Sequence, residues 1–238
     1  MAFHVGEKSP LTPSLTSYLL RVILVMLIVN SVLEIGFASA SAIWLHGLQH
    51  RVFHFFAYGS RHHLAGLPAS FIVNHVNTSI AAAVSGLMMG AWGLVALWMR
   101  NLTQYRTGAF AKYSRYGYYL WVSANVPSLV LTVVAIIYVF TVSKVKTGHR
   151  IDTQLAVELN GAPYTRDTWT PQTWLAAVLK LKLLRDREDI SDQLKLMEGW
   201  QFNNIPLFVI QLIATIIAFM DYVRWTRKPK LPASYGGF

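Results

Sequence analysis

Four long apolar segments constrain this chain more than any other feature. They cover residues 18–45, 80–99, 118–142 and 205–222, and charged side chains are rare within them. A helix needs roughly 20 apolar residues to cross the hydrocarbon core of a bilayer. Because backbone polar groups in lipid must be bonded within their own segment, each of these stretches is expected to be helical. The sequence therefore predicts an all-α fold, a four-helix transmembrane bundle.

The distribution of charge supports the same interpretation. Charged residues make up 13% of the chain, about half the share that is usual in soluble domains. The basic residues collect after the second and fourth segments: Arg100, Arg106, Lys112, Arg115, Arg224, Arg227, Lys228 and Lys230. Short basic loops stay on the cytosolic side of a membrane. We therefore expect cytosolic tails at 1–17 and 223–238, a membrane domain at 18–222, and the bilayer rather than nucleic acid as partner.

The segment 143–204 is predicted to lie outside the cytosol, and it has structure of its own. Thr170 followed by Pro171 is typical of a helix start, because the threonine side chain can cap and proline suits the first turn. Apolar residues from Trp174 to Leu183 then recur at helical spacing. A second short helix is expected to start after Asp189 or Ser191. Together these helices predict a small helical extracytoplasmic cap.

Polar side chains inside the apolar segments are the candidate functional residues. Asn30 and Glu34 share a helix face in the first segment, and Ser85 and Gln211 are expected at a similar depth. This intramembrane polar cluster has three interpretations: a clasp that fixes helix register, a site for a proton, cation or polar ligand, or a water-exposed group near a span end. A polar or charged side chain inside the membrane costs enough free energy that it usually has a structural or functional role.

Two charged residues lie nearer the cytosolic ends of the spans. Arg21 of the first segment and Asp221 of the fourth either pair with each other, or Arg21 extends to the lipid phosphates. Either arrangement would anchor the helices at that side of the membrane.

A stripe of small residues runs along the second segment. Its members are Ala82, Gly86, Gly90 and Gly93. Small residues let helix backbones approach closely in lipid. The stripe therefore predicts helix packing, either inside the bundle or at a dimer interface.

Histidines are concentrated in the loop after the first segment. His46, His50 and His54 have i, i+4, i+8 spacing, and on a helix they would form one ridge able to bind a transition metal. The alternative is an interfacial belt of aromatic and histidine side chains. The second box of membrane di-iron enzymes is incomplete, since Gly59 stands where a histidine is needed. We predict no catalytic residue and no cofactor, with the metal ridge as the alternative.

The last third of the chain carries a resemblance. The stretch from Asp167 to Lys180, then Asp189–Ile190–Ser191 and Leu196–Met197–Glu198–Gly199–Trp200, resembles a family of uncharacterised fungal integral membrane proteins. The layout is also similar to tetraspan proteins of cell-surface microdomains, such as the eisosome-associated and claudin-like groups, although this chain lacks the cysteines usual in claudin-like outer loops. The resemblance implies a fungal source, four spans and a structured outer loop.

These observations favour a multi-pass membrane protein with a structural, scaffolding or membrane-organising role, acting through helix–helix association with copies of itself or with other membrane proteins. The alternatives are a small proton- or ion-coupled transporter using Glu34 and a metal-binding protein using the histidine ridge. Ala38–Ser39–Ala40 has the form of a signal-peptidase site, but we expect the first span to be retained. Span length favours the plasma membrane over the thinner endoplasmic reticulum bilayer.

Overall fold

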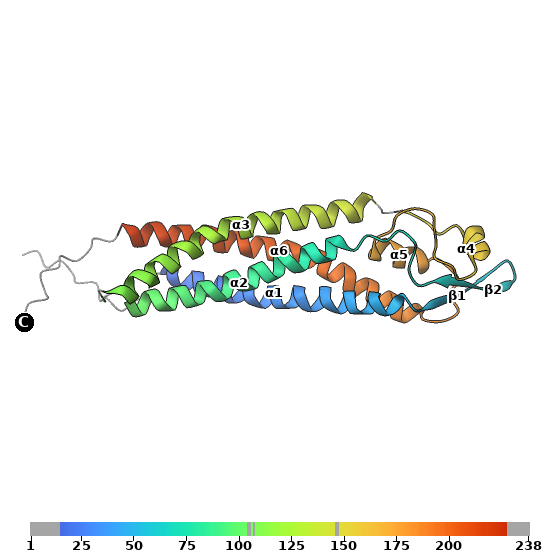
Figure 1. Ribbon diagram of the computed structural model, residues 1–238, viewed down its shortest axis with the longest axis horizontal. Helices are drawn as coiled ribbons and strands as arrows, with labels where there is room; N and C mark the ends of the chain where they lie inside the picture. The colour runs from blue at the N-terminus through green and yellow to red at the C-terminus, as the bar shows by residue number, and fades with distance from the viewer. Residues whose placement is uncertain (1–14, 104–105, 107, 146–147, 228–238) are drawn as a thin grey trace, which may run out of the picture.

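Four long helices dominate the structure (Figure 1). The computed structural model describes residues 15–103, 106, 108–145 and 148–227. The long helices are α1 (Leu15–Leu48), α2 (Asn74–Thr103), α3 (Ala109–Val145) and α6 (Arg187–Thr226). Each is long and apolar enough to cross a membrane. The prediction of four long apolar helices is therefore confirmed. Most of both predicted tails, 1–14 and 228–238, lies outside the described residues.

The long helices form a bundle in which each packs mainly against two neighbours. The order around the bundle is α1, α2, α3, α6, and α6 closes the ring on α1. Chain neighbours run in opposite directions, so α1 begins and α6 ends at the same end of the bundle (Figure 1). The two strands and the two short helices gather at the other end. We call that end the cap side and the opposite one the terminal side.

The buried positions of the long helices follow a heptad pattern. On α1 the buried side chains are spaced alternately by three and four residues from Ser17 through Glu34 to Leu48, and α6 repeats this from Met197 to Asp221. A repeat of 3.5 residues keeps one seam facing its partners when helices cross at a small left-handed angle. The bundle is thus built as coiled-coil packing with an apolar outer surface.

The helices extend beyond the predicted spans, and α6 corrects the prediction most. A separate short helix was expected before a span that opened at Ile205, but α6 continues without a break from Arg187 through Pro206. Pro206 lacks an amide hydrogen and leaves the carbonyl of Phe202 without its helical partner. Both residues lie on the exposed face of α6, so the proline ring does not disturb the buried seam. The fourth span and the second cap helix are one helix.

The cap comprises β1 (Val52–Ala57), β2 (Ser60–Ala65), α4 (Thr153–Leu159), α5 (Pro171–Val178) and their connections. A small helical cap was expected from residues 143–204, and β1 and β2 add an antiparallel hairpin to it from the loop after α1. Tyr58 and Gly59 make its two-residue turn, and both have positive φ angles of 49° and 80°. That combination is the hairpin turn whose twist matches the strands.

The predicted start of α5 is confirmed, but its predicted length is not. Thr170 caps the helix through a hydrogen bond from the amide of Thr173, and Pro171 lies in the first turn. The helix ends at Val178. Residues beyond it run along β1, where the amide of Phe56 donates to the carbonyl of Lys182 at 2.9 Å. An extended segment that pairs with β1 thus replaces the second half of the expected amphipathic helix.

The cap and the bundle share one hydrophobic core. Buried side chains from the hairpin, α4 and α5 pack with those from the cap-side ends of all four long helices. Five of its aromatic side chains have no solvent exposure: Phe55, Tyr164, Trp169, Trp174 and Trp200. The indole of Trp174 donates to the carbonyl of Gly66 at 2.7 Å. The cap is therefore packed directly on the helix ends.

Candidate functional site

The carboxylate of Glu34 lies at the centre of a buried polar cluster near the cap. It accepts hydrogen bonds from the hydroxyl of Ser79 and from the amides of Asn203 and Asn204, at 2.8 and 3.1 Å for the two amides. Asn204 also donates to Ser79 at 2.8 Å. Glu34, Ser79 and Asn204 have no solvent exposure. We call Glu34, Ser79, Asn203 and Asn204 the cap-side layer. It joins α1, α2 and α6 through hydrogen bonds from uncharged side chains to one carboxylate.

The cap-side layer shares only Glu34 with the predicted cluster. Ser85 instead bonds to Ser128 of α3 at 2.9 Å. Asn30 and Gln211 lie further along α1 and α6, and no hydrogen bond in the described chain joins them to Glu34. Ser79 and the two asparagines were missed because the predicted spans began just after them. Continuing the heptad spacing beyond those boundaries identifies Ser79 and Asn204.

A second buried polar layer joins all four long helices at the terminal side. The carboxylate of Asp221 on α6 accepts from the guanidinium of Arg100 on α2, from the hydroxyl of Tyr118 on α3 at 2.7 Å, and from the hydroxyl of Ser17 on α1 at 2.8 Å. The side chains of Arg100 and Asp221 are 9% and 4% exposed, so this ion pair is desolvated. The guanidinium also lies 4.6 Å from the ring centre of Tyr118. We call these four residues the terminal layer.

The terminal layer corrects the prediction for Asp221. The partner of Asp221 is Arg100 and not Arg21. Arg100 was assigned to a cytosolic loop, although α2 continues to Thr103 and turns Arg100 towards the bundle interior. Arg21 lies outside the buried seam of α1, at an intermediate exposure.

The two layers are matched in register. Ser17 and Glu34 are 17 residues apart on α1, and their partners Asp221 and Asn204 are also 17 residues apart on α6. At 1.5 Å per residue this separates the layers by about 25 Å. Because α1 and α6 run antiparallel, a slip of either helix by one heptad would break both layers together.

Unpaired polar atoms lie between the two layers. Asn30 Nδ2, Ser31 Oγ, Asn125 Oδ1 and both side-chain atoms of Gln211 are buried and have no hydrogen-bond partner within the described chain. Ser31 and Gln211 have no solvent exposure and belong to the buried seams that also carry Glu34 and Asn204. Such atoms cost free energy unless they are bonded. They extend the polar character of the interior from the cap-side layer towards the middle of the bundle.

The predicted small-residue stripe faces the inside of the bundle. A β-carbon at Gly86 would lie 2.7 Å from the hydroxyl of Ser31, and one at Gly90 would lie 2.6 Å from Cγ1 of Ile28. At Gly93 the nearest atoms belong to the ring of Trp121, at 2.6 Å. Ala82 is fully buried in the same row. Of the two interpretations, packing within the bundle describes these residues, and the dimer interface does not.

The predicted histidine ridge is not formed. Because α1 ends at Leu48, His46 lies in the helix, His50 lies in the following turn and His54 lies in β1. His54 instead faces His63 of β2, with ring centres 4.7 Å apart. Within the described ranges no group of three or more histidine or acidic side chains is placed to hold a metal ion. Helical spacing was misleading here because the segment continues into a hairpin.

The comparisons with known proteins gave no relative from which a function could be inferred. No family model matches the chain, and neither the curated proteins nor the solved structures gave a match.

Proposed function

We propose that this chain is an integral membrane protein with a structural, membrane-organising role, in which four spans hold the cap at the extracytoplasmic surface and associate laterally with further copies. Both termini lie in the cytosol, and the plasma membrane is the favoured location. The sequence resemblance supports a place among the fungal four-span proteins named above. Each part of this proposal has its own support.

The shared core of cap and bundle carries the proposal. Aromatic side chains of the cap pack on the ends of all four long helices. The polar layers join α1, α2 and α6 at the cap side and all four helices at the terminal side. A cap seated in this way cannot tilt without moving the spans. The arrangement suits a protein whose cap is presented rigidly at a membrane surface, where it contacts lipid or a partner.

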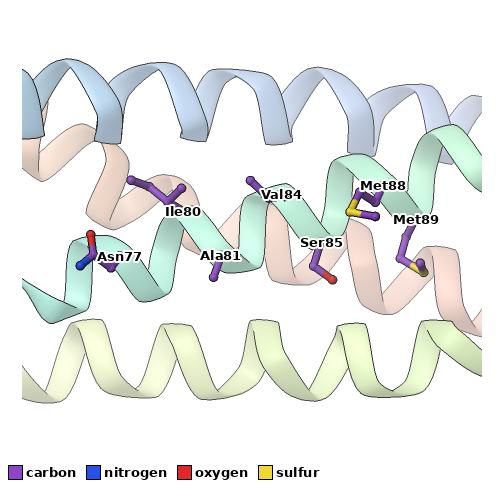
Figure 2. Close-up of a pocket in the computed structure, with 7 residues that line it drawn as sticks. All are labelled: Asn77, Ile80, Ala81, Val84, Ser85, Met88 and Met89. Carbon is purple, nitrogen blue, oxygen red and sulfur yellow. The ribbon is translucent and has the colours of Figure 1, made fainter.

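The lipid-facing side of α2 supports lateral association. It carries a shallow groove of about 570 Å3 whose lining is all from this helix, next to α3 (Figure 2). Ala81, Val84 and Met88 lie on the exposed face of α2 in this groove. The small side chain of Ala81 permits close approach of another helix. The glycine stripe is occupied inside the bundle, so this opposite face of α2 is the one available to a second copy.

Crosslinking in native membranes tests lateral association. The chain has no cysteine, so single-cysteine variants need no background substitutions. With Val84→Cys or Met88→Cys, a short bifunctional maleimide is expected to give a covalent dimer. Val130→Cys on the exposed face of α3 is the matched control and is expected to stay monomeric. Equal crosslinking at Val84, Met88 and Val130, or none at any, would contradict association through α2.

A second candidate function, proton or ion coupling, has one specific observation in its favour. Glu34 is a buried acid, and the unpaired atoms of Ser31, Asn30 and Gln211 follow it along the same two helices. Intramembrane acids with polar neighbours are typical of proton and ion pathways. The carboxylate would be the coupling group, and the polar interior would guide the ion towards the terminal side.

Glu34→Gln separates this candidate from the structural one. The amide keeps one oxygen acceptor for Ser79 or Asn204, so the variant is expected to fold. A coupled transporter would lose its proton flux in vesicles made with purified protein, whereas a structural protein would show the same background leak before and after the substitution. Glu188→Gln, an exposed acid on α6, is the control.

A further inference from the structure

A basic pocket lies at the terminal side, where α3 begins. Its volume is about 400 Å3, and Arg106, Lys112, Arg115, Tyr116 and Tyr119 contribute to its lining. Lys112, Arg115, Tyr116 and Tyr119 have i, i+3, i+4, i+7 spacing, so they share one face of α3. Arg106, from the connection between α2 and α3, completes the basic lining. The pocket is thus formed by one helix face and the connection that precedes it.

In the described part of the chain, no acidic side chain neutralises the positive charge of this pocket. Arg106, Lys112 and Arg115 are exposed, and none forms an ion pair with an acid in the described part of the chain. Among the described residues, Asp221 is the acid on this side of the bundle, and Arg100, Tyr118 and Ser17 bond to its carboxylate. Three cations around one pocket therefore favour a ligand with negative charge.

The depth of the pocket matches the lipid headgroups. Tyr118 belongs to the terminal layer, and Arg115 and Lys112 lie about 5 and 9 Å beyond it along α3. Tyr119 packs against Tyr222 and Trp225 of α6, with ring centres 5.7 and 5.5 Å apart. Clusters of tyrosine and tryptophan are typical of the boundary between hydrocarbon and headgroups. The cations thus lie just outside the apolar zone.

The face of α3 that lines the pocket continues into the apolar zone. Val126 and Val130 follow Tyr119 on it, and both are exposed, at 46% and 56%. A molecule with a charged head in the pocket and an apolar tail along this face would satisfy both parts of the surface. A phospholipid has this form, and a soluble phosphate compound does not.

We propose that this pocket binds the headgroup of an anionic phospholipid of the cytosolic leaflet, with more than one negative charge. Arg106, Lys112 and Arg115 contact the phosphate oxygens, and the acyl chains lie along α3. Basic pockets on the cytosolic side of membrane proteins bind such headgroups. The assignment to the cytosolic leaflet rests on the orientation proposed above, whereas the binding itself does not depend on lateral association.

The test is a titration of the full-length protein, purified in neutral detergent, with three lipids: phosphatidylinositol 4-phosphate, phosphatidylserine and phosphatidylcholine. Native mass spectrometry gives the apparent Kd of each. The affinity is expected to fall in that order. Lys112→Gln with Arg115→Gln is expected to weaken the phosphoinositide by about thirtyfold, because each basic residue near the headgroups contributes about a factor of five. Lys180→Gln with Arg185→Gln, exposed basic residues of the cap side, is the matched control.

Three results would overturn the proposal. The first is equal affinity for all three lipids, and the second is a pocket variant that binds like the control. The third is tight binding of free inositol 1,4-bisphosphate, equal to that of the lipid, since acyl chains would then contribute nothing. Arg106→Gln alone gives an independent reading if the double variant fails to fold, and it is expected to weaken binding by about fivefold.

Discussion

The residues of the terminal layer show how a buried charge is accommodated in an apolar bundle. Asp221 is surrounded by a guanidinium and two hydroxyls from three other helices. A charged side chain in the apolar part of a bilayer costs at least a few kcal/mol, so it persists only with partners. Removing one partner leaves the opposite charge buried without compensation. Substituting one member of the Arg100–Asp221 pair is therefore expected to lower the free energy of unfolding more than substituting one member of an exposed pair would.

Substitution of Arg100 or Asp221 alone is the sharpest residue-scale test. Arg100→Gln and Asp221→Asn are each expected to lower the free energy of unfolding by about 3 kcal/mol, and the double variant by less than their sum. Unfolding in mixed micelles, followed by circular dichroism, gives the values. Arg51→Gln with Asp189→Asn, an exposed pair 3.1 Å apart, is expected to cost less than about 1 kcal/mol. Similar losses for the two pairs would show that burial of Arg100 does not matter.

Single residues also show which features of the polar layers can be predicted from the sequence. Glu34 is evident as an acid in an apolar segment, because a charge in oil is conspicuous. Its partners are not evident, because serine and asparagine near a span end are compatible with any loop. Arg100 was assigned to the wrong environment for a related reason, since a basic residue after an apolar segment usually marks the cytosol. The role of Arg100 depends on whether it lies within α2, where it faces the bundle interior, or in the loop that follows. The sequence alone does not show where α2 ends.

Among the helices, α2 depends on the absence of side chains. Its glycines admit α1 and Trp121 to contact distances that a β-carbon would not allow. Gly90→Leu is expected to reduce the free energy of unfolding by about 2 kcal/mol or more through overpacking against Ile28. Thermal unfolding in detergent measures the loss. The crosslinking efficiency of a folded Gly90→Leu protein is expected to be unchanged.

Gly36→Ala is the matched control for the glycine prediction. Gly36 lies in α1, and a β-carbon there would meet no atom within 4 Å. Alanine is the better helix former, so this variant is expected to be as stable as the parent or more stable by about 0.5–1 kcal/mol. A loss of stability at Gly36 equal to that at Gly90 would show that close packing of α2 on α1 is not the cause.

Helices and strands were predicted unequally well from the sequence. The four apolar helices follow from length and hydropathy, which act within each segment. The hairpin was missed because its alternating aromatic and histidine residues also fit a helix ridge, and the Tyr58–Gly59 turn decides between them. The unbroken course of α6 was missed because the span was expected to begin at Ile205, after a separate short helix. The segment after α5 pairs with β1 and so favours the hairpin, and the buried positions of α6 continue on both sides of Pro206.

At the scale of the whole molecule, orientation in the membrane is the property to test. Lys112 and Arg227 both lie at the terminal side, and Glu158 lies in the cap. In sealed cells, cysteine at Glu158 is expected to react with a membrane-impermeant maleimide, whereas cysteine at Lys112 or Arg227 is expected to react only after permeabilisation. Reaction of Lys112 and Arg227 from opposite sides would refute the four-span topology.

The equal spacing of the two polar layers on α1 and α6 has a consequence for where the protein can reside. In the proposed membrane arrangement, the two layers fix the positions of the four helices relative to one another at two levels about 25 Å apart, so the exposed apolar surface of the bundle has a constant height. A bilayer of different thickness must deform to meet it, at a cost that grows with each ångström of mismatch. The layers therefore determine which bilayer thickness fits the protein with least deformation. Lengthening all four long helices by one heptad each between the layers should sort the protein towards thicker membranes.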